Sequence, residues 1–361
     1  MSQVENIAVM EIGGSHDECL LSQFFALKQR GCRVYFIGTE AIWLRNSSFH
    51  ALVDEFIPVK LAQGALADFL TMRRLNGYFE SQNIRKVILN TAQGGHVRNL
   101  CLTAKKSTEF IGIIHTLRKF NGSFTQNVIS KKIKKYLVLN DYFLTQIEPS
   151  ADQRIVSFYP LRFPSFNRST AEHKSGKQIT VIGGVENRRK DLAGSIGLMK
   201  QLLDLDLHIV FLGKSDLNNE GVQQFKETLL ENGLLDRVTL YDHFVDEKEF
   251  DRMVKQSDFI WPMIHPDTES AVEYFRNQIP GALNVALGYK IPLLVHEDFV
   301  KEWKDLSFAA SYRLDTFRSD TENALANAEQ LKLTLEQVEA YNPSFQEEKY
   351  LEFIFGNKSK K

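Results

Sequence analysis

The fold is decided by residues 179–214, which read ITVIGGVENRRKDLAGSIGLMKQLLDLDLHIVFLGK. An apolar run at 179–182 ends in Gly183 and Gly184, and apolar residues then recur at helical spacing over 192–203. A second apolar run at 207–212 ends in Gly213. Short strands separated by a helix pair in parallel, because the crossover between parallel strands needs about a dozen residues. This segment therefore predicts an α/β domain built on a parallel sheet.

The beginning of the chain repeats this pattern. Residues 7–38, IAVMEIGGSHDECLLSQFFALKQRGCRVYFIG, contain a strand ended by Gly13 and Gly14, a helical stretch and a second strand. Such units are common enough for the likeness to arise by chance, but it falls at the start of each half of the chain. Further strands are predicted at 56–59, 87–90, 110–115, 136–140, 238–241, 259–261 and 293–295. We therefore predict an α/β fold of two Rossmann-like domains that face each other across a cleft.

The boundary between the two domains is predicted at residues 158–178, a stretch without periodicity that is rich in proline, serine and glycine. Two domains are also expected from the length of 361 residues, since a single core stops growing at about 250–300 residues. We assign residues 1–160 to the N-terminal domain and 175–335 to the C-terminal domain. Residues 336–361 are predicted to form a C-terminal helix and a disordered tail.

Composition excludes several classes of protein. A formal net charge of −1 gives no field that would attract nucleic acid, so we expect no nucleic-acid partner. Three cysteines without metal-like spacing argue against a zinc site and against a disulfide framework. Neither a signal-peptide pattern at the N-terminus nor a long apolar run is present, so we expect a cytoplasmic protein.

The clearest candidate for ligand binding is the glycine-rich turn at 183–191 with the basic residues that follow it. Gly183 and Gly184 let a ligand approach the backbone, and the start of a helix offers free N–H groups. Arg188, Arg189 and Lys190 add positive charge at the same place, a combination that suits a diphosphate. The segment lacks both the dinucleotide fingerprint and the P-loop pattern, and a tight turn followed by exposed, solvated cations is the alternative reading.

Two further segments of the second half follow predicted strands. Gly213 and Lys214 end the strand at 207–212, where ligands of parallel sheets bind, although a plain turn explains them as well. After the strand at 259–261, Glu269 could accept hydrogen bonds from sugar hydroxyls, and Tyr274 lies in the same loop. Gly281 is expected near the start of a helix, where its N–H could contact a phosphate or sugar.

In the first half, three segments follow strands and are expected to meet at one edge of the sheet. They contain Gly13, Gly14 and His16, then Gly94 and Gly95, and finally His115. A single histidine is more often structural than catalytic, but the convergence of three segments favours a site.

A basic segment in the same half contains Lys131, Lys132, Lys134 and Lys135 beside aromatic residues. It predicts either peripheral contact with the inner face of an anionic membrane or a solvated helix face.

With these motifs in view, the second half resembles the donor-binding domain of GT-B glycosyltransferases, and is most similar to glycosyltransferase family 4. The resemblance rests on VIGGVENRRKDLAGSIGLMKQLL, LHIVFLG, DRVTLYDHFVDEKEFDRMVKQSDFIWPM and GALNVALGYKIPLLV. The first half resembles the acceptor domain through EIGGSHDECLLSQFFALKQRGCRVYF and the pair Ile114 and His115. The resemblance implies a nucleotide-sugar donor in the C-terminal half and an acceptor in the N-terminal half.

The resemblance also implies roles for single residues. Lys190 matches the lysine of the family that contacts donor phosphates, and Arg189 stands in for its arginine. The family's pair of glutamates is not intact: counting from Glu269, the second position holds Asn277, and the helix that follows offers Asn284. We take His115 and Glu269 as the catalytic candidates.

These observations lead to a first hypothesis, a glycosyltransferase of the hexosyltransferase type. It would move a sugar from a nucleotide sugar to a hydroxyl of a glycan or lipid-linked acceptor, in polysaccharide or glycan assembly. Cationic side chains would stabilise the departing diphosphate, so we expect neither a metal ion nor a cofactor. Family likeness suggests retention of the anomeric configuration. The broken glutamate pair favours a non-catalytic GT-B binding or scaffold protein instead, and a sugar-nucleotide epimerase is the third hypothesis.

Overall fold

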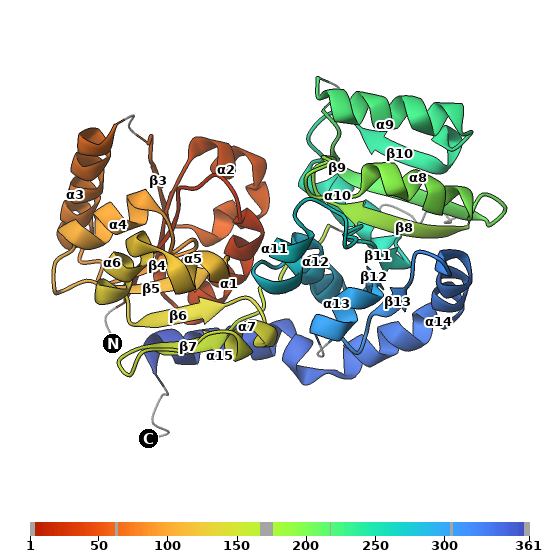
Figure 1. The fold of residues 1–361 in the computed structure, drawn as a ribbon. Helices are drawn as coiled ribbons and strands as arrows, with labels where there is room; N and C mark the ends of the chain where they lie inside the picture. The colour runs from red at the N-terminus through yellow and green to blue at the C-terminus, as the bar shows by residue number, and fades with distance from the viewer. Residues whose placement is uncertain (1–3, 62–63, 167–175, 217, 304–305, 357–361) are drawn as a thin grey trace. The chain divides into compact units, whose positions relative to one another are not determined.

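The computed structural model describes residues 4–61, 64–166, 176–216, 218–303 and 306–356 (Figure 1). The chain divides into two compact units. Unit 1 comprises Met1–Arg162 together with Pro343–Lys361, and unit 2 comprises Phe163–Asn342. Each unit is an α/β structure around a parallel sheet, so the predicted fold class is confirmed for each half of the chain.

The sheet of unit 1 has seven strands within the described residues, in the order β3-β2-β1-β4-β5-β6-β7, and every neighbouring pair is parallel. The order 3-2-1-4-5 is that of a doubly wound Rossmann sheet, in which the strand order reverses between β1 and β4 while all strands stay parallel. The strands are β1 (Asn6–Glu11), β2 (Arg33–Gly38), β3 (Glu55–Pro58), β4 (Lys86–Leu89), β5 (Glu109–Ile114), β6 (Lys135–Val138) and β7 (Arg154–Ser157).

The helices of unit 1 pack in two groups. Right-handed crossovers place α1 and α4 on opposite faces of the sheet, because β1 leads to β2 in one direction and β4 leads to β5 in the other. In one group α4 packs on α3 and α6, and in the other α1 packs on α15 and η2. The elements are η1 (Asp17–Cys19), α1 (Leu20–Gln29), α2 (Glu40–Arg45), η2 (Ser47–Leu52), α3 (Ala65–Ser81), α4 (Gly95–Thr103), α5 (Leu117–Gly122), α6 (Phe124–Lys132), α7 (Asp141–Thr145) and α15 (Pro343–Phe355).

Unit 2 is built on a sheet of four described parallel strands in the order β10-β9-β8-β11, and β12 and β13 form a second, two-stranded parallel sheet. A bridge between Ile260 and Leu293 joins the two sheets. The strands are β8 (Lys177–Ile182), β9 (Leu207–Lys214), β10 (Val238–Tyr241), β11 (Phe259–Ile260), β12 (Leu294–His296) and β13 (Ala310–Tyr312). The helices are α8 (Leu192–Lys200), α9 (Glu220–Glu231), η3 (Leu235–Arg237), α10 (Glu247–Lys255), α11 (Ala271–Arg276), α12 (Gly281–Tyr289), α13 (Glu297–Glu302), α14 (Phe317–Gln337) and η4 (Glu339–Tyr341).

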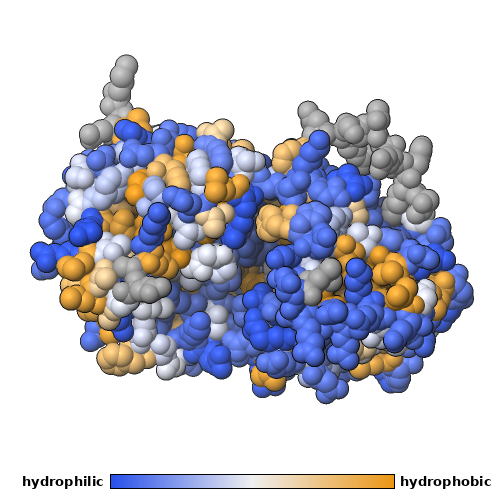
Figure 2. All heavy atoms as spheres, turned by 90° about the horizontal axis from the view of Figure 1, so that it is seen from above, coloured by the Kyte–Doolittle hydropathy of each residue, from blue (hydrophilic) through white to orange (hydrophobic). Residues whose placement is uncertain are grey.

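Side-chain caps and buried strands explain these elements. Helices begin where a polar side chain accepts a hydrogen bond from a free backbone N–H, as Asn140 does from Phe143 at 3.0 Å and Asp246 does from Glu249 at 2.9 Å. Central strands such as β1 and β8 are buried on both faces, as parallel strands covered by helices must be. On the face shown in Figure 2, hydrophobic side chains lie scattered among hydrophilic ones. None of the described helices is long and apolar enough to cross a membrane.

The C-terminal segment differs from its predicted assignment. The sequence analysis kept residues 336–361 apart, but the structure divides them between the units. Helix α14, which ends at Gln337, contributes to the core of unit 2, and α15 packs against α1 in unit 1. The predicted disordered tail, residues 357–361, lies outside the described residues. Residues 167–175 of the predicted boundary also lie outside them, and the division between the units falls at Arg162 and Phe163.

Candidate functional site

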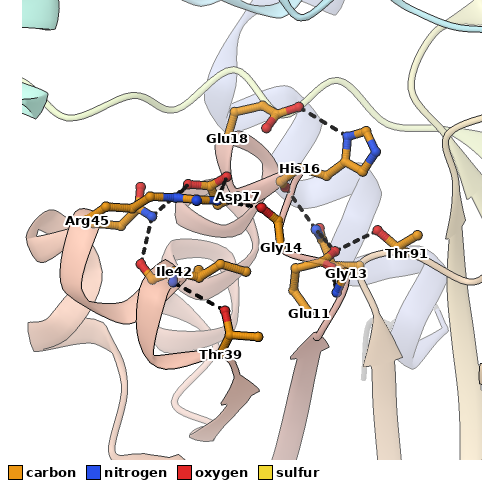
Figure 3. Close-up of polar contacts among 12 residues, drawn as sticks. Glu11, Gly13, Gly14, His16, Asp17, Glu18, Thr39, Ile42, Arg45 and Thr91 are labelled. Atoms are coloured by element: carbon orange, nitrogen blue, oxygen red, sulfur yellow. Dashed lines mark hydrogen bonds and ion pairs between the residues drawn. The ribbon is translucent and has the colours of Figure 1, made fainter. Parts of the chain in front are cut away.

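Polar side chains gather at the carboxyl edge of the sheet of unit 1 (Figure 3). Because β1 pairs with β4, and β4 with β5, the residues that end or follow these strands meet there. They are Glu11, His16, Asn90, Thr91 and His115, which we call the unit 1 cluster. The sequence analysis expected His16 and His115 at this edge but took the strand that ends in Glu11 for an apolar run.

Glu11 is the buried centre of the unit 1 cluster, with 1% of its surface exposed. Its Oε1 accepts a hydrogen bond from the Gly13 N–H at 2.7 Å, and its Oε2 accepts from Asn90 Nδ2 at 2.8 Å and Thr91 Oγ1 at 2.6 Å. Burial raises the pKa of Glu11, while the bonds from Thr91 and Asn90 oppose this rise. A carboxylate with three donors therefore ties the end of β1 to the glycine turn and to the end of β4.

The two histidines of the cluster stack on each other, with ring centroids 3.8 Å apart, but their environments differ. His115 is buried, and its Nε2 contacts the backbone oxygen of Asn90 at 2.6 Å, so this nitrogen carries the proton and donates. Burial and the neighbouring His16 hold the pKa of His115 well below its usual value. Burial also lowers the pKa of His16, but the nearby carboxylates of Glu18 and Glu11 outweigh it, so the net shift is upward.

An ion pair holds the loop that carries His16. Asp17 accepts hydrogen bonds from Arg45 Nε at 2.8 Å and from Arg45 Nη2 at 2.6 Å, and Nη2 also donates to the Gly14 oxygen at 3.0 Å (Figure 3). His16 itself has a positive φ of 66°, and Gly14 one of 77°. Such angles are unusual for histidine, so the bonds around the loop offset the cost of its conformation.

Gly94 and Gly95 lie next to this cluster, at the start of α4. Gly94 has a φ of 98°, which favours glycine. The preceding Gln93 accepts hydrogen bonds at Oε1 from the N–H groups of His115 and Thr116 at 3.3 and 3.1 Å, which ties the glycine turn to the end of β5. The structure thus brings the three predicted segments of unit 1 together.

In unit 2, the ends of β8 and β9 lie so close together that only glycine fits. A Cβ atom on Gly213 would lie 2.4 Å from the carbonyl carbon and oxygen of Gly183. Gly183 has a φ of 90°, which also favours glycine. Within the described chain, the N–H of Gly184 has no hydrogen-bond partner, while its oxygen accepts from Lys190 Nζ at 3.1 Å. Lys214 lies beside this turn but is exposed and pairs with Asp216.

The position of Lys190 disagrees with the alternative interpretation of exposed, solvated cations. Its side chain folds back under the glycine turn, and the residue is only 5% exposed. Among the described residues no carboxylate forms an ion pair with it. Burial, with Arg189 nearby, lowers the pKa of Lys190 to about 8. The structure therefore buries an ammonium group whose single protein partner is a neutral carbonyl.

Arg189 is placed differently from Lys190. It is half-exposed, and its Nε pairs with Glu186 Oε1 at 2.8 Å, while Arg188 Nε lies 4.0 Å from the same carboxylate. The loop is joined to the next candidate segment because Ser270 Oγ donates to the Arg188 oxygen.

A buried chain of polar groups, absent from the sequence analysis, fixes the start of α8. Asp191 caps α8 by accepting from the Gly194 N–H at 2.8 Å, and its other oxygen meets His265 Nδ1 at 2.7 Å. His265 Nε2 contacts the Tyr312 hydroxyl at 2.7 Å, which in turn accepts from Trp261 Nε1 at 2.8 Å. Since Asp191 already uses one N–H group of the first turn, the helix start offers fewer free donors than predicted.

The remaining predicted residues of unit 2 are spread along the loop from β11 to α12. Glu269 is exposed, Asn277 is half-buried, and within the described residues neither side chain forms a hydrogen bond or ion pair. Tyr274 is buried, which raises its pKa against the effect of Arg189 and Arg188. Gly281 is the first residue of α12, and Asn284 is buried one turn later with its Oδ1 unpaired. No contact among the described side chains brings Gly281 to Lys190.

A dyad beside the unit 1 cluster was also missed. Asp68 of α3, 5% exposed, contacts His96 Nδ1 of α4 at 2.5 Å and accepts from Asn99 Nδ2 at 2.6 Å. Within the described residues, no group of three or more His, Cys, Asp or Glu side chains could hold a metal ion.

Comparison with solved structures identifies the fold. The chain is similar to an assigned UDP-N-acetylglucosamine 2-epimerase from Listeria monocytogenes, with 12% identity, a TM-score of 0.67, and 96% and 95% of the two chains covered. It is similar to a glycosyltransferase from Rickettsia africae ESF-5, with 11% identity, a TM-score of 0.66, and 98% of each chain covered. A UDP-GlcNAc 2-epimerase from Neisseria meningitidis, solved with UDP-GlcNAc, matches at 11% identity and a TM-score of 0.64, over 98% and 100% of the chains.

These neighbours share the GT-B fold of two Rossmann-like domains, and this chain has that fold. No family profile matches the chain, and no curated protein matches it by sequence. Membership of glycosyltransferase family 4 stays a prediction, since the neighbours include both transferases and epimerases.

Proposed function

We propose that this protein is a glycosyltransferase that moves a sugar from a nucleotide sugar to a hydroxyl group, and that unit 2 holds the donor. One observation carries the proposal: the buried ammonium of Lys190 beside the glycine turn of β8, which forms no ion pair within the described residues. A buried cation without a counter-charge is costly, and an anionic ligand would offset that cost. The free N–H of Gly184 adds a donor at the same place. Together they suit the diphosphate of a nucleotide sugar.

The chemistry needs little from the protein beyond charge and orientation. When the sugar leaves, negative charge develops on the diphosphate, and Lys190 would stabilise it by a charge-assisted hydrogen bond. The chain from Asp191 to Trp261 would keep α8 and the glycine turn in place while this charge develops. Gly213 contributes by allowing β9 to approach the turn. Neither a cofactor nor a metal ion has a part in this proposal.

For the acceptor we propose the unit 1 cluster. His16 suits the role of a base better than His115, because His115 donates its one proton to Asn90 and burial keeps its pKa low. His16 is partly exposed, and the nearby carboxylates outweigh burial and raise its pKa above its ordinary value. In this scheme His16 takes the proton of the acceptor hydroxyl, and His115 supports its ring by stacking. The acceptor class, a glycan or lipid-linked glycan in polysaccharide assembly, is part of the proposal.

The segment with Lys131, Lys132, Lys134 and Lys135 is the candidate for peripheral membrane contact. Lys134 pairs with Asp152 at 2.7 Å and Lys135 with Glu109 at 2.9 Å, so these two ammonium groups are partly neutralised. Lys132 donates to the Lys105 oxygen at 2.7 Å. A solvated helix face accounts for this arrangement at least as well as a docking surface, and flotation with anionic vesicles at two salt concentrations separates the two.

A second candidate function is sugar-nucleotide epimerisation, because the similar structure from Neisseria meningitidis is a UDP-GlcNAc 2-epimerase, and the one from Listeria monocytogenes is assigned to the same activity. The two functions share a donor site and differ in the need for an acceptor. A non-catalytic binding protein is the third candidate, since Asn277 breaks the pair of glutamates that the resemblance implies, and neither it nor Glu269 forms a hydrogen bond or ion pair within the described residues.

Calorimetry with UDP, GDP, ADP and their sugars tests the donor site. We expect one nucleoside diphosphate to bind, and the absence of binding across this panel would overturn the proposal. With the nucleotide sugar that binds, NMR of the mixture without acceptor separates the enzymes: an epimer of the sugar identifies an epimerase. Transfer to added glycan acceptors identifies a transferase.

A further inference from the structure

A continuous chain of buried hydrogen bonds runs from the C-terminal helix to the unit 1 cluster. Tyr350 of α15 is fully buried, and its hydroxyl donates to Gln23 Oε1 at 3.1 Å. Gln23, on α1, donates from Nε2 to Asn90 Oδ1 at 2.6 Å. Asn90 donates from Nδ2 to Glu11 Oε2 at 2.8 Å and to the backbone oxygen of His16 at 2.9 Å. The last helix of unit 1 is thus linked to the residues that shape its candidate site.

The order of donors and acceptors gives each amide in this chain one orientation. Gln23 Nε2 also donates to the Cys19 oxygen at 3.0 Å, so a flipped Gln23 would turn its oxygen toward two other oxygens. A flipped Asn90 would likewise turn its oxygen toward the Glu11 carboxylate and the His16 oxygen. Buried groups that face each other acceptor to acceptor are costly, so each member of the chain holds the next.

We propose that Tyr350 and Gln23 are positioning residues, which hold Asn90 in the orientation that fixes Glu11 and the His16 loop. Neither residue reaches the edge of the sheet itself; both act through Asn90. The catalytic meaning of this arrangement rests on the proposed role of the unit 1 cluster. On this proposal α15 is part of the site as well as part of the core.

The pKa of His16 should show whether the hydrogen bonds from Tyr350 through Gln23 to Asn90 are intact. The groups that face His16 are Glu18 and Asp17 in its own loop, Glu11 from β1, and the stacked His115 that follows β5. Arg45 of α2 acts on it through Asp17 and the Gly14 oxygen. If Asn90 loosens, Glu11 loses one of its three donors and binds a proton more readily. The negative charge beside His16 then falls, and the pKa of His16 should fall with it.

The test uses full-length Tyr350→Phe and Gln23→Met, which keep the side-chain volume and remove the polar groups. Tyr78→Phe is the control: its hydroxyl donates to Glu55 Oε1 at 2.7 Å elsewhere in unit 1, so it loses a similar bond outside the chain. The imidazole of His16, assigned by its loss in His16→Asn, is titrated by NMR. We expect its midpoint to move to lower pH by about 0.3 unit or more in both variants and to stay unchanged in the control.

An unchanged His16 titration in both variants, with thermal stability lowered as in Tyr78→Phe, would overturn the proposal and leave the chain a purely structural feature. In an active transferase we expect kcat to fall in both variants while the KM for the donor stays constant. The titration needs no turnover, so it also separates the two claims. A parent protein that binds no nucleoside diphosphate would refute the proposed function without altering the outcome for His16.

Discussion

At the residue scale, the proposed donor site of unit 2 depends on Lys190. Its ammonium is buried and its partner is neutral, so the folded protein carries a cost that an anionic ligand removes. A site of this kind is less stable when empty than when occupied. The stability of the protein and its affinity for a diphosphate should therefore respond in opposite directions to a change at this residue.

Lys190→Met tests this opposition. Removing the charge should weaken the binding of a nucleoside diphosphate by about ten- to a hundredfold, since one charge-assisted hydrogen bond contributes about 1.5–3 kcal/mol. The methionine fills the space of the lysine stem, so the free energy of unfolding should rise by about 1–3 kcal/mol. Calorimetry and urea unfolding measure the two effects. Lys200→Met, on an exposed lysine of α8, is the control and should change neither; equal affinity in Lys190→Met and the parent protein would reject the site.

The pKa of Lys190 gives a second prediction. In the folded protein this group loses its proton near pH 8, against an ordinary value of 10.5, so between these values the unfolded chain binds more protons. Stability should thus gain from this group as the pH rises from 8 to 10.5, and diphosphate affinity should decline over the same range because only the charged form binds. Calorimetry at a series of pH values measures the affinity. A constant affinity up to pH 10 would show that Lys190 is not in the site.

At the scale of the elements, each site depends on how the ends of neighbouring strands are tied together. In unit 1 the Glu11 carboxylate joins the ends of β1 and β4, and in unit 2 the chain from Asp191 to Trp261 joins α8 to β11 and β13. These hydrogen-bonded networks are buried, so the loss of one member leaves its partners buried without a hydrogen bond. A partly broken network therefore destabilises the fold more than an apolar contact in its place would. A substitution in the middle of such a network should therefore disturb the start of the helix that the network holds.

His265→Phe applies this argument to α8. The substitution leaves Asp191 and the Tyr312 hydroxyl without their buried partner, which should lower the free energy of unfolding by about 1–3 kcal/mol. It should also reduce diphosphate affinity, because Lys190 directly precedes Asp191, the cap of α8. Thermal unfolding and calorimetry measure these effects. His208→Phe loses a single bond to Thr239 in the same unit and should leave diphosphate affinity intact; a similar loss in both variants would mean that His265 has no special link to the site.

The strands and glycine turns of both sites could be predicted from the sequence, while the ties between them could not. Apolar runs ended by Gly13–Gly14 and Gly183–Gly184 mark strands and turns through local periodicity alone. Glu11 was missed although a single acid in a buried strand is a usable signal. Its place at the centre of the unit 1 cluster comes from its bonds to residues about 80 positions away. The burial of Lys190 was also missed, because it depends on how the side chain folds back under its own turn.

At the scale of the whole molecule, unit 1 is assembled from the two ends of the chain. The side chains of α15 that face α1 are buried, and Arg162 Nε pairs with the almost fully buried Glu347 at 2.5 Å. Periodicity predicted this helix, but its return to the first unit is a tertiary contact that no local pattern carries. Unit 2 is formed by one contiguous segment, Phe163–Asn342.

A truncated protein that ends after Asn342 tests whether unit 1 needs α15 while unit 2 does not. Loss of α15 exposes the apolar face of α1 and removes Tyr350 from the hydrogen-bonded chain that leads to Asn90. Unit 1 should therefore unfold at a lower temperature, while unit 2 should still bind its nucleoside diphosphate. Calorimetric scanning resolves the two transitions, and titration measures the binding. The full-length protein with Tyr350→Phe is the milder comparison. Loss of nucleotide binding together with α15 would show that the units do not act separately.

The return of α15 to unit 1 also orders events during synthesis. A ribosome completes unit 2 before it releases α15, so unit 2 can fold on the nascent chain while α1 still lacks its packing partner. Gln23, which holds Asn90, gains its bond from the Tyr350 hydroxyl only when α15 docks. If unit 2 holds the donor, as proposed, a polypeptide that terminates early leaves the ribosome with a finished donor half and an unfinished acceptor half, and it would hold a nucleotide sugar without a competent place to deliver the sugar.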